Sequence, residues 1–341
     1  MKGWANWWPR ISERSRPMID RYGRRIDYAR VSVTSRCNLR CVYCRPEKGA
    51  DLGEGQLSAG QILKVASALA ALGIRRIRIT GGEPLLRVDL VDVLRALNKL
   101  RGLEKISLTT NGLLLPRLLE ELAPDELGGL NISLNSHDSA AYQAITRTGR
   151  LEDALAGLRA ALDLGFPNIK INCVAIAALN DSGLEEVALF ARDQDIAVRF
   201  IESMPVGLGK SYAPIRQEQI SARLEARFGP LTPCPGRFGH GPAVYYRLPG
   251  FRGKIGFISA VSRRFCESCN RVRVTSAGYL KTCLHFRHGL DLGPLLEPDI
   301  PEAALMDGIK LAILEKPRGH SFSSSFGEYE EETGLMSTIG G

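Results

Sequence analysis

The amino-acid sequence predicts an α/β protein whose main part is a parallel sheet, followed by a smaller α+β appendage. Six short β-branched runs recur through the first 205 residues, and apolar residues at helical spacing fill the segments between them. Strand followed by helix, repeated in this way, indicates right-handed βαβ units. Six units are too few for a closed eight-stranded barrel, so the pattern leaves an open barrel or a doubly wound sheet. Both folds bind ligands at the carboxyl ends of their strands.

The individual elements follow from local composition. Strands are expected at 29–34, 76–80, 105–110, 130–135, 169–176 and 197–203. The clearest helical patterns cover 61–72, 88–100, 153–164 and 184–193. A connector containing Gly and Pro at 205–214 leads to a short helix at 217–228 and then to a turn-rich stretch with short strands.

These changes of composition divide the chain of 341 residues. We expect an N-terminal extension at 1–26, a barrel core at 27–210, an appendage at 211–316 and a tail at 317–341. The tail is polar, rich in Ser and Gly, and ends in two glycines, a composition typical of a mobile segment.

The chain carries 45 Lys and Arg residues against 37 Asp and Glu, a formal net charge of +8. This excess is typical of an anionic partner (nucleic acid, acidic membrane surface or phosphorylated small molecule) or of a basic solvated surface. The sequence has no apolar run long enough for a membrane span and no secretory signal at its start. We therefore expect a cytoplasmic, reducing location, where cysteines serve as metal ligands or catalytic groups. Cys173 and Cys234 are expected to contribute packing only.

Three cysteines follow the first predicted strand in one short loop, and we call them the first trio: Cys37, Cys41 and Cys44. Three thiolates so close in sequence can converge on one metal centre. A structural zinc site needs four ligands, and no fourth Cys or His lies nearby. Three thiolates suit a [4Fe–4S] cluster with one iron left open. Three unrelated buried thiols would not explain this place at the end of a strand.

A second trio lies in the appendage: Cys266, Cys269 and Cys283. Taken alone, it could be a zinc ribbon that lacks one ligand, with His285 or His288 as the fourth. Two incomplete trios in one chain are more coherent as two clusters, each with one iron free to bind something else.

The motifs around these cysteines resemble a known family. SVTSRCNLRCVYC followed by ITGGEPLL is similar to the radical S-adenosylmethionine (SAM) superfamily. RIRITGGEPLLR, LTTNGLLL, NISLNS, RFIESMPVG, FCESCNRVRVTSAGYLKTCL and the Gly-Gly end resemble the GTP 3′,8-cyclase family, which begins molybdenum cofactor biosynthesis. The resemblance runs from about Ile19 to Gly341 and implies an open (β/α)6 barrel of the radical SAM type, with a second cluster in the appendage.

The resemblance implies two [4Fe–4S] clusters and SAM as cofactors. The first trio would hold the cluster that binds SAM, and the second trio the cluster that faces the substrate. SAM would be contacted by Tyr43, Gly81, Gly82, Ser133 and Met204. The two glycines would let the backbone approach SAM closely, whereas Met204 could equally be a core residue.

Basic residues inside the strands point to an anionic substrate. Side chains alternate along a strand, so Arg76 and Arg78 share one face. A charge that faces a barrel interior needs a partner, although a surface ion pair is the alternative for any single Arg. The resemblance implies that GTP is bound by Arg30, Arg78, Thr109, Lys170, Arg271 and Arg273. Charge-assisted contacts are the natural way to hold a triphosphate.

The resemblance also implies four catalytic residues: Arg271, Arg273, Gly340 and Gly341. In the implied reaction, a hydrogen atom leaves C3′ of GTP, the C3′ radical attacks C8, and reduction and protonation follow. Arg271 or Arg273 would donate the proton. The two glycines would insert into the cavity, because only residues without side chains fit such a gap.

The implied partners are GTP, a one-electron donor, cyclic pyranopterin monophosphate synthase as the recipient of the product, and a second copy of the chain. Neither nucleic acid nor membrane is expected. The sequence departs from the family pattern at Ser35, Arg45 and Asn135, and none of these residues is a ligand. Two rival hypotheses stay open: a radical SAM enzyme that modifies a peptide, and a zinc-containing protein that binds nucleic acid.

Overall fold

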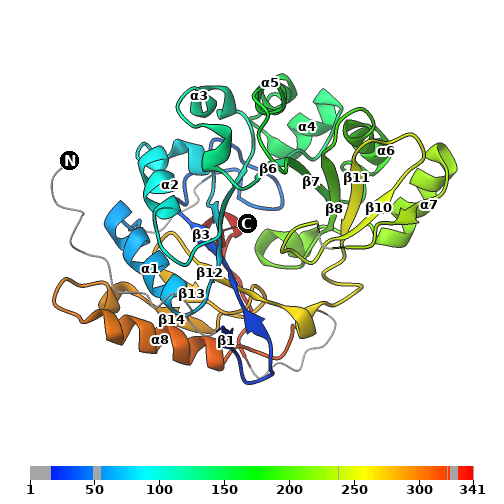
Figure 1. Ribbon diagram of the computed structural model, residues 1–341. Helices are drawn as coiled ribbons and strands as arrows, with labels where there is room; N and C mark the ends of the chain where they lie inside the picture. The colour runs from blue at the N-terminus through cyan, green and yellow to red at the C-terminus, as the bar shows by residue number, and fades with distance from the viewer. Residues whose placement is uncertain (1–16, 49–54, 237, 321, 323–328, 341) are drawn as a thin grey trace.

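A single curved sheet forms the framework of the molecule. The computed structural model describes residues 17–48, 55–236, 238–320, 322 and 329–340. Within these residues, a twelve-stranded sheet has the order β14-β13-β12-β3-β4-β5-β6-β7-β8-β11-β10-β9. The sheet curves into an open barrel (Figure 1). The parallel α/β architecture predicted from the sequence is confirmed, and the sheet is not closed.

The strands of this sheet are β3 (Tyr28–Ser32), β4 (Arg76–Thr80), β5 (Lys105–Thr110), β6 (Leu130–Ser133), β7 (Lys170–Ala175), β8 (Ala197–Glu202), β9 (Thr232–Pro233), β10 (Val244–Arg247), β11 (Lys254–Ile258), β12 (Arg271–Val274), β13 (Tyr279–Lys281) and β14 (Gly289–Asp291). A separate small hairpin pairs β1 (Met18–Ile19) with β2 (Arg25–Ile26). All six predicted strands form, each within about a residue or two of the expected bounds.

The helices are α1 (Ala59–Ala71), α2 (Leu90–Asn98), α3 (Leu115–Leu119), α4 (Ser139–Thr146), α5 (Leu151–Asp163), α6 (Leu184–Ala188), α7 (Gln217–Phe228), α8 (Glu302–Leu314) and α9 (Met336–Ile339). Helices α1 to α6 follow one another around the outside of the sheet (Figure 1). Local sequence explains where two of them begin. Ser58 and Gln61 form a reciprocal capping box at α1, and the Asp138 carboxylate accepts the Ala141 amide at the start of α4. None of the described helices is long and apolar enough to cross a membrane.

The strands of the appendage belong to the same sheet as the barrel. Strand β11 pairs in parallel with β8, and β12 pairs in parallel with β3. The C-terminal part of the chain therefore extends the barrel sheet at both edges. A six-stranded sheet would leave the hydrogen-bonding groups of β3 and β8 unpaired, and these two strands cover them. Residue spacing alone does not reveal such long-range pairing.

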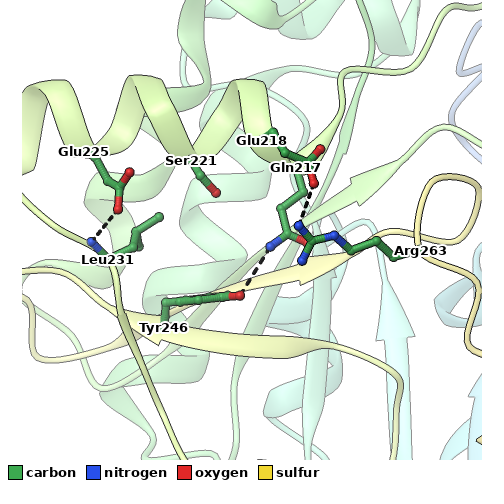
Figure 2. Close-up of a pocket in the computed structure, with 7 residues that line it drawn as sticks. All are labelled: Gln217, Glu218, Ser221, Glu225, Leu231, Tyr246 and Arg263. Carbon is green, nitrogen blue, oxygen red and sulfur yellow. Dashed lines mark hydrogen bonds and ion pairs between the residues drawn. The ribbon is translucent and has the colours of Figure 1, made fainter.

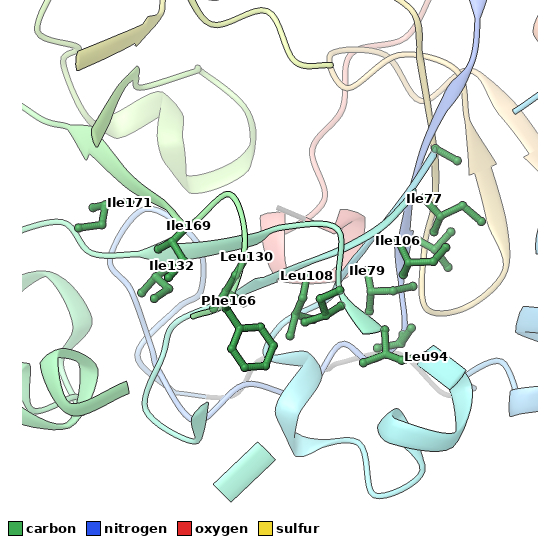
Figure 3. Close-up of a cluster of buried hydrophobic side chains, with 14 of the residues drawn as sticks. Ile77, Ile79, Leu94, Ile106, Leu108, Leu130, Ile132, Phe166, Ile169 and Ile171 are labelled. Carbon is green, nitrogen blue, oxygen red and sulfur yellow. The ribbon is translucent and has the colours of Figure 1, made fainter. Parts of the chain in front are cut away.

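Alternation along the strands separates an apolar outer face from a polar inner face. Ile77 and Ile79 of β4, together with Ile106 and Leu108 of β5, point toward the helical layer and are almost fully buried (Figure 3). The intervening residues of β4 and β5, such as Arg78 and Thr109, point into the barrel. Removing the apolar face from water stabilises the sheet, while the inner face stays free for polar chemistry.

Part of the tail is ordered, contrary to the mobile segment expected from its composition. Glu331 forms an isolated β-bridge with Phe286, and α9 follows at 336–339. The red C-terminal part lies in the middle of the curved sheet in Figure 1. The N-terminal residues 1–16 and Gly341 lie outside the described residues.

Candidate active site

One cavity is lined by both cysteine trios. Its lining includes Thr80, Thr110 and Ser133 at the carboxyl ends of β4, β5 and β6, where the fold class places ligands. The lining includes all six cysteines of the two trios, and Met336 of the tail also reaches it. The cavity therefore brings together two groups separated by more than 200 residues of sequence.

A second hollow carries none of this chemistry. It lies between α7 and β10 and is lined by Gln217, Glu218, Ser221, Glu225, Leu231, Tyr246 and Arg263 (Figure 2). Its polar groups already pair with one another: Arg263 with Glu218 at 2.7 Å, and the Gln217 amide with the Tyr246 hydroxyl at 3.4 Å. None of the residues singled out in the sequence lies in it.

The first trio occupies the loop after β3. A turn holds its end together, because the amides of Cys44 and Arg45 both donate to the Cys41 carbonyl, at 2.9 and 3.0 Å. Burial raises the pKa of Cys37 to about 11 and, together with the neighbouring Cys37 thiol, that of Cys44 to about 12. Burial also raises the pKa of Cys41 well above its usual range, with Cys44 and Cys37 adding to the effect. Three thiolates here need a cationic group among them, which iron supplies.

The second trio lies in a more positive environment. Burial would raise the pKa of Cys269, but Lys316 and Arg271 outweigh it and lower that pKa to about 6. Lys316 is buried, and its ammonium donates to the carbonyls of Arg271 and Thr282. Burial raises the pKa of Cys266. A thiolate at Cys269 is thus stabilised by the protein alone, which suits a metal ligand.

A buried arginine fixes the backbone of the second trio. The Arg24 guanidinium donates to the carbonyls of Cys266 at 3.0 Å and Arg318 at 2.8 Å, and it pairs with Asp20 at 2.6 Å. This contact joins the β1–β2 hairpin to the segment that carries Cys266.

The histidines considered as zinc ligands have other contacts. His285 lines the cavity and packs against the rings of Phe286 and Phe322. His288 lies 3.0 Å from the Thr282 hydroxyl and is absent from the cavity lining. In the part of the chain that the structure describes, no three His, Cys, Asp or Glu side chains form a group that could hold a single metal ion.

The residues expected to contact SAM all line the cavity: Tyr43, Gly81, Gly82, Ser133 and Met204. The structure explains why glycine is needed at both positions, which the sequence alone did not show. A Cβ on Gly81 would lie 2.5 Å from the Thr34 carbonyl oxygen, and one on Gly82 would lie 2.3 Å from that of Arg36. The Gly82 amide donates to Thr34 at 2.7 Å. These glycines therefore let the loop after β4 pack directly on the loop of the first trio.

Glu83 lies in the GGEP sequence after β4 but was not among the site residues predicted from the sequence. Its side chain is buried and lines the cavity. The carboxylate accepts from the Thr110 hydroxyl and from the Asn111 amide, both at 2.7 Å. Burial raises the pKa of Glu83 to about 7 despite these contacts. This places a titratable acceptor beside the first trio.

The basic residues expected to bind GTP divide into two groups. Arg30, Thr109, Arg271 and Arg273 line the cavity, whereas Arg78 and Lys170 do not belong to its lining. The backbone register nevertheless places Arg273, Arg30 and Arg78 side by side on β12, β3 and β4. Arg78 donates to the Tyr28 hydroxyl and reaches the Thr109 hydroxyl at 3.5 Å. The inner face is therefore continuous from the cavity to Arg78.

Positive charge accumulates on this face, where the cationic side chains lower one another's pKa. Burial, together with Arg199 and Arg78, lowers the pKa of Lys170 to about 7. Burial and Arg271 lower the pKa of Arg273 to about 10. Arg76, by contrast, pairs with Asp27 and Glu104 at 2.8 and 2.9 Å, so the ion-pair interpretation holds for that residue.

Two residues of the inner face, Tyr28 and Arg199, were not among the site residues predicted from the sequence. Tyr28 begins β3 one residue before the expected strand, and Arg199 lies within a predicted strand, where its Nε donates to the Asn172 amide oxygen at 2.8 Å. Alternation along that strand would have placed Arg199 on the inner face.

The end of the tail reaches the same face. Arg273 donates to the Gly340 carbonyl at 2.5 Å. Gly340 has a φ of +83°, and a Cβ there would lie 3.1 Å from Ser32 and 3.2 Å from Thr80. Both the backbone conformation and the space favour glycine. Gly341 lies outside the described residues.

Known proteins share both parts of this chain. The family model described as Radical SAM superfamily matches residues 31–191, and that described as Molybdenum Cofactor Synthesis C matches residues 196–322. GTP 3′,8-cyclase of Clostridium perfringens (strain 13 / Type A) is 38% identical over 326 residues, which cover 95% of this chain and 100% of that protein. GTP 3′,8-cyclase of Peptoclostridium acidaminophilum is 42% identical over 327 residues, covering 95% and 98%. The chain belongs to the GTP 3′,8-cyclase family.

Membership of the GTP 3′,8-cyclase family confirms the resemblance seen in the sequence. A radical SAM domain works with an iron–sulfur cluster and SAM, and the donor set of the first trio fits such a cluster. The crystal structure of Streptococcus suis SuiB has a TM-score of 0.56 at 14% identity, covering 90% of this chain and 76% of that one. At this identity the likeness concerns the fold alone.

The structure places the three departures from the family pattern around the first trio. The Asn135 amide donates to the Tyr43 hydroxyl at 2.9 Å, and its oxygen accepts from the Val174 amide at 2.9 Å. Arg45 is buried and donates to the Cys37 carbonyl at 3.3 Å. Ser35 is buried as well. In this member of the GTP 3′,8-cyclase family, Asn135 and Arg45 thus contact residues that flank or form the first trio.

Proposed function

We propose that this protein converts GTP to (8S)-3′,8-cyclo-7,8-dihydroguanosine 5′-triphosphate by radical SAM chemistry, the first step of molybdenum cofactor biosynthesis. The observation that carries the proposal is the shared cavity. Both trios, the candidate SAM residues and four of the six candidate GTP residues line it. A reaction between two bound molecules requires them to be held side by side.

The first trio is the proposed ligand set of a [4Fe–4S] cluster that binds SAM. With SAM, this cofactor supplies a carbon-centred radical that takes a hydrogen atom from the substrate. Tyr43, Ser133 and Met204 border the space beside the trio and would orient SAM there. Gly81 and Gly82 keep the loop of the first trio against β4. The polar Glu83 carboxylate is positioned to accept a hydrogen bond from a cationic group of SAM.

The inner face of the barrel is the proposed GTP site. A triphosphate carries nearly four negative charges, and Arg30, Arg78 and Lys170 are its proposed cationic partners. Burial and the neighbouring Arg273 and Arg78 lower the pKa of Arg30, and burial together with Arg199 and Arg78 lowers that of Lys170, as expected where positive charges are crowded together. Thr109 adds a hydroxyl beside Arg78. Binding of an anion there would relieve the mutual repulsion that lowers the pKa of Lys170.

The second trio is the proposed ligand set of a second cluster, which would face the guanine base. Lys316 and Arg271 favour the thiolate form of Cys269, as ligation requires. Arg271 and Arg273 follow that cysteine on β12 and are the candidate proton donors to the closing ring. The Gly340 carbonyl holds Arg273 from one side, which orients its guanidinium.

Anaerobic reconstitution tests this function. The purified chain, given iron, sulfide, SAM, GTP and a chemical reductant, is expected to form 5′-deoxyadenosine and cyclised GTP together. About eight irons per chain are expected for two clusters. Stoichiometric zinc without iron, or 5′-deoxyadenosine formation with no GTP binding, would overturn the proposal. The second outcome would favour the peptide-modifying alternative.

A further inference from the structure

A buried ion pair joins the tail to the hairpin formed by β12 and β13, which lies between Cys269 and Cys283 of the second trio. The Lys281 ammonium, on β13, contacts the Glu332 carboxylate, and their side chains are only 2% and 10% exposed. Isolated charges this deep are unfavourable, so each of the two side chains depends on the other. The partners lie 51 residues apart in sequence, so their contact ties the tail to strand β13.

Both members of the pair also bind backbone. Lys281 donates to the Phe286 carbonyl at 2.7 Å. The second oxygen of Glu332 accepts from the Gly334 amide at 2.6 Å, and the Glu332 amide donates to the His285 carbonyl at 2.7 Å. The pair therefore fixes the path of the backbone on both sides of Glu332, as well as its side chain.

The segment beyond this pair runs to the cavity. We call residues 329–340 the terminal strap. Ser337 and Ile339 of the strap are buried, Met336 lines the cavity, and Gly340 accepts the hydrogen bond from Arg273. Gly207 supports the strap from the other side, since a Cβ there would lie 2.6 Å from the Gly334 carbonyl oxygen. Only a short stretch of chain separates Glu332 from Gly340, so fixing Glu332 restricts where Gly340 can lie.

Two other ion pairs of the strap lie at the surface, and the Glu331 carboxylate also lies 3.7 Å from Nε2 of the buried His285. Glu331 pairs with Lys210 at 3.0 Å, and Glu330 pairs with Arg287 at 3.0 Å, but all four side chains are about half exposed or more. Surface pairs contribute little because water and salt screen them. Burial distinguishes Lys281–Glu332 from its neighbours.

We propose that Lys281 and Glu332 are a positioning pair that holds the terminal strap across the cavity and so delivers Gly340 to Arg273. The consequence for the reaction rests on the function proposed above. The position of the strap does not, because it can be measured without substrate or turnover.

The test is hydrogen exchange of the full chain, purified anaerobically, with Glu332→Gln compared with the matched neighbour Glu331→Gln. Glu332→Gln keeps the shape and the acceptor for Gly334 but leaves Lys281 without its counter-charge. Peptides covering 329–340 are expected to exchange at least about tenfold faster than in the wild type. Peptides of α1 and α5 should be unchanged, and Glu331→Gln should leave the strap within about twofold of the wild type. Glu332→Asp, which retains the charge on a shorter side chain, should fall between them.

Unchanged exchange of the strap in Glu332→Gln would overturn the proposal, as would an equal effect of Glu331→Gln. Loss of protection throughout the sheet in both Glu332 variants would also overturn it, because the pair would then be a general determinant of folding. A second readout concerns coupling. The ratio of cyclised GTP to 5′-deoxyadenosine should fall in Glu332→Gln at matched iron content, and a ratio equal to the wild type would contradict delivery of Gly340. If the wild type made no cyclised GTP while the strap was still released in Glu332→Gln, the proposed function would fail and the positioning pair would stand.

Discussion

The two cysteine trios face one cavity but differ in the charged side chains around them. Around the first trio, burial dominates, and Arg45 and Arg147 do not offset its effect on the thiol pKa values. At Cys269 of the second trio, Lys316 and Arg271 reverse the effect of burial. The first loop is held by close packing of its backbone on the loop after β4 and by Arg45, whereas the buried cations Arg24 and Lys316 hold the second. Two sites with three thiols each therefore differ. At the first trio a bound cluster would have to supply the positive charge that stabilises the thiolates, whereas at Cys269 the side chains of Lys316 and Arg271 already supply it.

Removal of a first-trio thiol is expected to have the largest effect. Cys41→Ala should reduce 5′-deoxyadenosine formation by more than about 100-fold, because the cluster that activates SAM loses a ligand. Cyclised GTP should disappear with it. Liquid chromatography of anaerobic reaction mixtures measures both products. Normal yield of 5′-deoxyadenosine from this variant would exclude the first trio as the SAM site.

Removal of a second-trio thiol should separate the two products. Cys283→Ala is expected to lower cyclised GTP by about 100-fold while 5′-deoxyadenosine continues to form, since the first trio is unchanged. The same chromatographic assay at equal protein concentration measures the ratio. Cys234→Ala serves as a control, because Cys234 lies outside both trios and the cavity lining. If both products fell together, the two trios would not have distinct roles.

A methyl group at Gly82 should damage the first site and spare the second. Gly82→Ala places a Cβ against the Arg36 carbonyl and is expected to cost about 1–3 kcal/mol of stability through overpacking. Gly183→Ala is the matched control, since a Cβ there meets nothing within 4 Å. Thermal unfolding of the iron-free chains measures the difference. Equal melting temperatures would show that the two loops can separate without cost.

The charge on the inner face should make GTP binding depend on pH. Lys170, with its pKa lowered to about 7, loses its proton as the pH rises through 7, so the affinity for a triphosphate should fall above that pH. The limiting slope is about tenfold per pH unit. Calorimetry between pH 6.5 and 8.5 should show weaker binding but a flatter profile in Lys170→Met. An unchanged slope in this variant would assign the titration to another group.

Sequence patterns predicted those features of the molecule that are local. The β-branched runs of β3 to β8 are short and regular, the first trio lies within one loop, and the second trio flanks the single hairpin of β12 and β13. The pairing of β12 with β3 and of Lys281 with Glu332 was not predicted, because neither leaves a periodic signal in the chain. The glycines after β4 were noticed, but their contact with Thr34 and Arg36 depends on how two loops fold against each other. Composition suggested a mobile tail, and a few specific contacts overcame that tendency.

The pairing of β12 with β3 also determines the order in which the molecule can be completed. The edge of β3 emerges early in synthesis, and its partner strand follows more than 200 residues later. Until then the edge of β3 beside the first trio has open hydrogen-bonding groups, which can pair with strands of other chains. The nascent chain therefore depends on its last third to cover β3, the first strand of its main sheet. Slow closure of such a distant contact is expected of this topology. Aggregation of chains released before β12 is synthesised would be its visible result.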